Sequence, residues 1–142
     1  MDRINKSLEL FNNGCNCCQA TFLSLSEEMG LEKETALKIA CGFGGGMHQG
    51  EVCGAVSGGI MLLGLKNGNG DLADQEAKEK TTELVKEFCS QFKQKNGSII
   101  CRELLGCDKS TESGKQYAED NNLKEKICQN LVKDAIELVS SF

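Results

Sequence analysis

Apolar residues recur along most of this chain three or four positions apart, which is the spacing of amphipathic helices, and no proline interrupts them. The pattern predicts helices at about 4–11, 17–29, 33–41, 72–95 and 123–139, together with a short helix that Gly106 closes. We therefore expect an all-α fold, a helical bundle of about five to seven helices in a single domain over residues 1–142.

The middle of the chain departs from this pattern. The stretch CGFGGGMHQGEVCGA, which begins at Cys41, is too rich in glycine for a regular element and predicts a loop. The segment 54–65 behind it is apolar on all sides but shorter than the ~20 residues that cross a bilayer. We expect a buried central helix, whose small residues allow another helix or a cofactor close to its backbone: Gly54, Ala55, Gly58 and Gly59. The same surface fits a homodimer.

The flanking segments carry further expectations. Asp71 follows a turn and is a natural N-cap for the long helix. The inward residues of that helix are expected to be Ala77, Leu84, Val85, Phe88 and Phe92. The polar segment 109–122 predicts a surface loop with one helical turn, and the last helix has an apolar stripe of Ile127, Leu131, Ala135 and Leu138.

Composition narrows the class of partner. The 142 residues include 39% hydrophobic and 26% charged residues, ordinary for a globular protein. The net charge of -5, with lysines interleaved among acids, disfavours nucleic acid and anionic membrane. The N-terminus shows no basic stretch before an apolar one, so we expect no export and a cytoplasmic location.

Nine cysteines are the outlying feature. In a cytoplasmic chain they indicate metal binding or redox chemistry rather than a disulfide framework. Some cysteines simply fill space as small buried hydrophobes. We expect this of Cys18, Cys41 and Cys89, which border or join apolar stripes, while Cys107 follows a helix end and is expected to be partly exposed.

The segment GCNCCQA, residues 14–20, separates two kinds of cysteine. Cys18 is in register with Phe22 and later apolar residues, so it belongs to the core. Cys17 lies about 100° around the helix, in the first turn, where free N–H groups and the helix dipole stabilise a thiolate. Cys15 and Cys18 also form a C-x-x-C, but no βαβ pattern surrounds it. Cys17 is therefore the expected chemical thiol.

Three more cysteines occupy comparable positions. Cys53 opens the central helix, and Cys101 opens the short helix CRELL. Cys128 shares a helix side with Val132 and Ala135, so it faces inward. Thiols from four helices could thus meet at one buried point.

The motifs GCNCCQA, GFGGGM before CGAVSGG, CRELLG and KICQNLV, in this order, resemble the C_GCAxxG_C_C family of redox-active proteins. The resemblance runs from about Gly14 to Val132. It implies that the family's four cysteines are Cys17, Cys53, Cys101 and Cys128, the last matched by a single residue. A similar domain occurs in a cytochrome that holds haem and an iron–sulfur centre. This chain lacks the C-x-x-C-H haem site.

Four thiolates suit an iron–sulfur cluster, with [2Fe-2S] favoured over [4Fe-4S], and by number they also suit tetrahedral zinc. Zinc is disfavoured because the four share no closely spaced C-x₂₋₄-C pair. Backbone N–H groups at Gly45, Gly46 and Gly54 are candidates for binding the cofactor. A phosphate loop is weak, since no Gly-Lys-Ser/Thr follows. His48 fits an exposed loop histidine better than a ligand or proton donor.

No acid–base pair or nucleophile triad is recognisable, so an independent enzyme is less expected than an accessory redox protein. We expect electron transfer or redox sensing, with a redox partner protein or oxidoreductase. Two alternatives stay open. One is a module that binds zinc or copper for transport or storage. The other is a metal-free thiol–disulfide protein.

Overall fold

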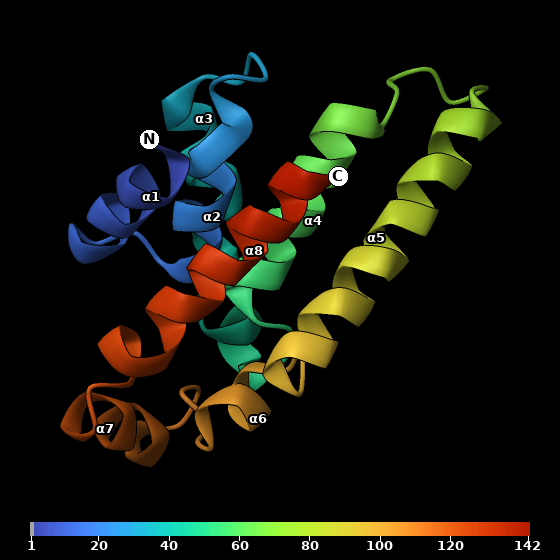
Figure 1. Cartoon of the computed structure of the whole chain (residues 1–142). Coiled ribbons are helices and arrows are strands. Elements are labelled where there is room, and N and C mark those ends of the chain that lie inside the picture. The colour runs from blue at the N-terminus through green and yellow to red at the C-terminus, as the bar shows by residue number, and fades with distance from the viewer. Residues whose placement is uncertain (1) are drawn as a thin grey trace.

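The computed structural model describes residues 2–142 and is built from helices joined by turns (Figure 1). The α-helices are α1 (Arg3–Asn12), α2 (Cys17–Ser26), α3 (Lys33–Ala40), α4 (Gly54–Asn67), α5 (Gln75–Asn96), α6 (Cys101–Leu105), α7 (Glu112–Asp120) and α8 (Gln129–Ser141). Irregular helical turns are η1 (Cys41–Phe43), η2 (Gly46–Gly50) and η3 (Lys124–Cys128). The all-α prediction is confirmed. Between residues 2 and 142 the β-type pairing is a single isolated antiparallel bridge, Val52 with Ile100.

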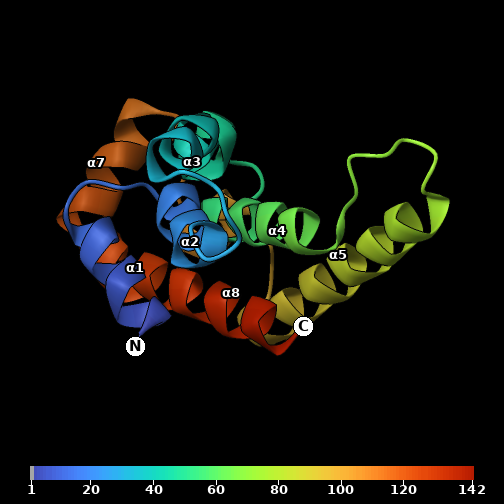
Figure 2. The same ribbon diagram turned by 90° about the horizontal axis from the view of Figure 1, so that it is seen from above.

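The apolar helix α4 is central, as predicted. It packs against α2 on one side and α5 on the other, and α8 crosses α1, α2, α4 and α5 (Figure 2). Glycines permit the close approach: a Cβ at Gly58 would lie 2.9 Å from the Cys18 carbonyl oxygen, and one at Gly59 would meet the Phe88 ring of α5. Within the described residues no helix combines the length and apolarity needed to cross a membrane.

A capping box starts α2. The Gln19 N–H donates to Asn16 Oδ1 at 2.9 Å, and the Asn16 N–H donates to Gln19 Oε1 at 3.0 Å. The Asn16 amide also donates to the Cys41 carbonyl at 2.9 Å, which ties the start of α2 to the glycine-rich segment. Cys17 is thereby held as the first residue of the helix.

Two boundaries differ from the prediction. Helix α5 begins at Gln75, because Asp74 rather than Asp71 caps it by accepting the Ala77 N–H at 3.0 Å. The Asp71 carboxylate instead accepts from the N–H two residues on, which holds a turn.

Helix α2 ends at Ser26, and turns lead on to Gly30. Of the inward face predicted for α5, Phe88 and Phe92 are fully buried and the other three residues are half-buried.

The segment 109–122 is more regular than predicted, since it contains α7. Thr111 caps this helix through the Gly114 N–H at 3.0 Å, and Ala118 is buried. The polar composition of this segment predicts a loop, but a cap and one small inward residue are enough for a helix here. The last helical region has Leu131 and Ala135 buried as predicted, but it starts with the π-type turn η3.

Candidate functional site

The four predicted cysteines stand at the ends of four elements. Cys17 and Cys101 are the first residues of α2 and α6, Cys53 is the N-cap of α4, and Cys128 ends η3. Cys53, Cys101 and Cys128 are buried, with 3%, 7% and 5% of their surface exposed, and Cys17 is half-buried.

Backbone pairing places Cys53 beside Cys101. The Cys53 N–H donates to the Ile99 carbonyl at 2.8 Å, and the Cys101 N–H donates to the Glu51 carbonyl at 2.6 Å. These two bonds flank the isolated bridge between the same segments. Cysteines separated by almost fifty positions therefore lie in adjacent, antiparallel pieces of chain.

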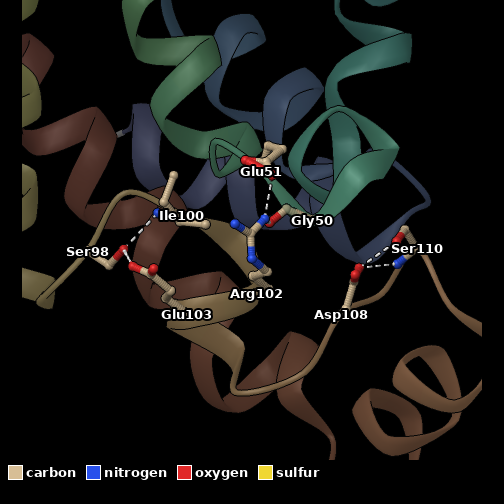
Figure 3. Close-up of polar contacts among 8 residues, drawn as sticks. All are labelled: Gly50, Glu51, Ser98, Ile100, Arg102, Glu103, Asp108 and Ser110. Atoms are coloured by element: carbon tan, nitrogen blue, oxygen red, sulfur yellow. Dashed lines mark hydrogen bonds and ion pairs between the residues drawn. The ribbon is translucent and has the colours of Figure 1, made fainter.

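Side chains hold the same two segments together (Figure 3). Arg102 of α6 donates to the Gly50 carbonyl at 3.0 Å and forms an ion pair with the Glu51 carboxylate. Ser98 donates to Glu103 at 2.6 Å, which orders the turn before α6. The Arg102 contacts clamp the end of the glycine-rich segment against α6, which carries Cys101.

The glycine-rich segment contains a left-handed turn. Gly45, Gly46, Met47 and His48 follow one another with φ of 58°, 67°, 62° and 57°. A Cβ at Gly46 would lie 2.5 Å from the Glu51 nitrogen and 2.9 Å from the Cys101 Cβ, so only glycine fits there. Met47 and His48 have no such freedom and are strained, a state that clusters at functional sites.

Cys17 and Cys128 interact through their side chains. A hydrogen bond with Cys17 outweighs burial and, with Lys109 and Lys124 nearby, lowers the pKa of Cys128 to about 7. The same interaction, together with burial, raises the pKa of Cys17 well above the usual range. Because the two thiols titrate as one interacting pair, the expectation that Cys17 is the chemical thiol stays a prediction.

The other two sulfurs interact with this pair. Burial raises the pKa of Cys53 to about 12, and the nearby backbone N–H groups of Ala55 and Val56 oppose this rise. Burial raises the pKa of Cys101 to about 11. Cys53 acts electrostatically on Cys17. Cys101 and Cys128 both act on Cys53, and Cys128 also acts on Cys101. The structure thus brings sulfurs from four elements into one neighbourhood, which we call the cysteine quartet: Cys17, Cys53, Cys101 and Cys128.

The quartet is not a preformed metal site. Over residues 2–142, no three His, Cys, Asp or Glu side chains are arranged to hold a metal ion. The donor set nevertheless fits a thiophilic group, because it consists of sulfur alone and is largely buried. Side-chain rotation would have to draw the sulfurs together around such a group.

The predicted glycines lie next to these cysteines. A Cβ at Gly54 would be 3.1 Å from the Cys17 Cβ, while Gly46 abuts Cys101 as described. Gly45 lines a cavity of about 320 Å³ together with the exposed His48. The two lysines of that cavity are Lys109 and Lys115.

The remaining cysteines divide between core and surface. Cys18 is fully buried, as predicted, with its sulfur 3.9 Å from that of Met61. Cys41 is exposed rather than a core residue, because α3 ends at Ala40 and the chain tightens into η1. Cys15 and Cys89 are half-buried. Cys107 is also half-buried, as predicted, and acts electrostatically on Cys101.

Two cations of the site are not evident from the sequence pattern. Lys109 acts on the sulfurs of Cys17, Cys101 and Cys128, and Lys124 acts on that of Cys128. Lys109 is in a segment taken for a surface loop, and Lys124 in a helix judged only by its apolar stripe. The sequence signal that could have identified Lys109 is its position only a few residues after Cys101.

Comparison with known proteins shows the family to which this chain belongs. A family model described as "Putative redox-active protein (C_GCAxxG_C_C)" matches residues 15–142. An Archaeoglobus fulgidus protein described as "Uncharacterized protein" is 36% identical over 62 residues, 42% of this chain and 41% of that protein. The matched part thus spans about two-fifths of that relative, and no solved structure matches. Because the family model covers nearly the whole chain, including the entire cysteine quartet, the protein belongs to the C_GCAxxG_C_C family of redox-active proteins.

Proposed function

We propose that this protein binds an iron–sulfur cluster through the cysteine quartet and acts in electron transfer or redox sensing with a separate oxidoreductase in the cytoplasm. One observation carries the proposal: four sulfurs from four distant elements share one neighbourhood and act on one another electrostatically. Cysteine thiolates are the usual ligands of such clusters. When bound, the cluster supplies one-electron redox chemistry.

The surroundings of the quartet suit a negatively charged group. Lys109 and Lys124 bring positive charge to it, and the backbone N–H groups of Ala55 and Val56 near Cys53 favour its thiolate. Hydrogen bonds to cluster sulfurs and ligands tune the reduction potential. The glycine at position 46 leaves the Cys101 side chain room that any Cβ would take. We favour [2Fe-2S] over [4Fe-4S], since the smaller cluster needs less space among largely buried cysteines.

The experiment is anaerobic purification and reconstitution with iron and sulfide, followed by absorption spectroscopy and iron, sulfide and zinc analysis. We expect a coloured protein with matched iron and sulfide. Replacing any quartet cysteine by serine should remove most of the iron, whereas Cys41→Ser, at an exposed cysteine, should keep it. A colourless protein with one zinc would instead support the metal-handling alternative.

A second candidate, a metal-free dithiol, is favoured by the hydrogen bond between Cys17 and Cys128. Oxidation would join the two sulfurs, release two protons and pass two electrons to an external disulfide, which becomes two thiols. Treating the metal-free protein with an excess of oxidised glutathione and mapping its peptides by mass spectrometry tests this. A Cys17–Cys128 disulfide that reduces again supports the candidate, and its absence at equilibrium with the reagent contradicts it.

A further inference from the structure

A second feature lies on the outer side of Cys128. A cavity of about 460 Å³ is lined by residues of α7 and η3 and by Lys109, and Cys128 forms part of its wall. This volume is in the range of small-molecule sites, ~300–1,000 Å³. Cys128, although 5% exposed, is therefore reachable from outside through this cavity.

The charged side chains that line the cavity are mostly lysines. Three lysines contribute to it, Lys109, Lys115 and Lys124, against two acids, Glu119 and Glu125. Among these lysines and carboxylates, with the Cys128 thiol left aside, the balance is one positive charge, in a chain whose net charge is -5. Such a local reversal of sign attracts anions toward a concave site.

The rest of the wall is partly apolar, since Leu105, Ala118 and Leu123 line it. These three residues are buried, so their apolar surface is part of the core and is presented to the cavity. A ligand that satisfies both parts of the wall carries oxyanion groups for the lysines and an apolar body for these side chains.

We propose that this cavity binds a small organic anion and is the entrance through which that anion reaches the sulfur of Cys128. Any redox role of the bound anion rests on the proposed function of the cysteine quartet. The binding itself requires only the lysines and the cavity. Lys109 and Lys115 also line the neighbouring cavity at Gly45 and His48, so they can be approached from two sides.

Alkylation of the reduced, metal-free, full-length chain tests the entrance. Iodoacetate is an anion and iodoacetamide is neutral, and both react with the same thiolate, so the ratio of their rates at Cys128 is independent of its pKa. We expect Lys109→Gln and Lys115→Gln each to lower this ratio about threefold or more. Lys109→Arg, which keeps the charge, and Lys133→Gln, at an exposed residue of α8, should leave it unchanged. Rates are read at Cys128 by peptide mass spectrometry.

Phthalate, two carboxylates on an apolar ring, tests the ligand class. It should slow the iodoacetamide reaction at Cys128 in the unmodified protein and do so several-fold less in Lys109→Gln. Sulfate, which has no apolar body, should protect poorly. Equal ratios in all variants, no protection by phthalate, or equal protection by sulfate would each overturn the proposal. These measurements use the metal-free protein. Failure to find iron would therefore contradict the proposed function without deciding whether the cavity binds anions.

Discussion

At the scale of single residues, the left-handed turn before α4 holds a non-glycine residue, His48, in a strained backbone conformation. His48 holds a φ of 57° that costs a non-glycine residue roughly 1–2 kcal/mol. The side chain is exposed, so little packing compensates for this cost. Strain kept at a position next to four convergent cysteines favours a role for the segment in the site rather than in stability alone.

The strain at His48 can be measured. We expect His48→Gly to raise the free energy of unfolding of the metal-free protein by about 1 kcal/mol, because glycine adopts this φ without the steric cost. Gln49→Gly is the control, since the next residue has no positive φ and should lose up to about 1 kcal/mol. Urea denaturation measures both. A loss of stability in His48→Gly would show that the side chain makes a contact worth more than the strain.

Also at this scale, the neighbours of Cys128 lower the pKa of its thiol. In the reduced, metal-free protein the alkylation rate of Cys128 should rise with pH around a midpoint near 7. Cys17→Ala should move the midpoint upward, because the hydrogen bond from Cys17 is the main cause of the low pKa. The sign for stability follows: since the folded pKa is lowered, the stabilisation is complete above the unfolded value and is lost as pH falls through 7. An unchanged midpoint in Cys17→Ala would contradict the assignment.

At the scale of elements, the contact between α4 and α2 depends on glycine. A Cβ at Gly58 would lie 3.0 Å from the Thr21 Cβ and 2.9 Å from the Cys18 carbonyl oxygen, both on α2. The start of α2 carries Cys17, and the start of α4 is capped by Cys53. The distance between these two helices therefore bears on the spacing of two quartet members.

Two alanine substitutions in α4 separate packing from helix propensity. Gly58→Ala should lower the free energy of unfolding by about 1–3 kcal/mol, because the added methyl group forces the helices apart. Gly64→Ala should raise it by up to about 1 kcal/mol, since no atom lies within 4 Å of the new Cβ and alanine favours the helix. Thermal and urea unfolding measure both. Similar effects at the two positions would refute the close contact.

At the scale of the whole molecule, the quartet joins elements from both ends of the chain. A cluster bound by α2, the start of α4, α6 and η3 would bind the folded state in preference to the unfolded one. We expect chelation of the iron to lower the unfolding temperature by several degrees, and Cys53→Ser to abolish that difference. Scanning calorimetry with and without chelator measures it. A chelator effect of full size in Cys53→Ser would place the metal elsewhere.

The sequence by itself determined most of the helices and the cysteines that begin them. Spacing of apolar residues and local caps act over a few positions, so they could be read directly at Cys17, Cys53 and Cys101. The same local signals were ambiguous at two places. Both Asp71 and Asp74 could cap the long helix, and Asp74 does so. The polar residues 112–120 resemble a loop in composition but form a helix.

Only the tertiary structure decided which groups act on the Cys128 sulfur and which cavity Cys128 lines. The low pKa of Cys128 comes from Cys17, Lys109 and Lys124, of which Cys17 lies in α2 and Lys109 between α6 and α7. The cavity likewise forms between α7 and η3. Electrostatics and cavities depend on distances through space, which helical periodicity does not encode.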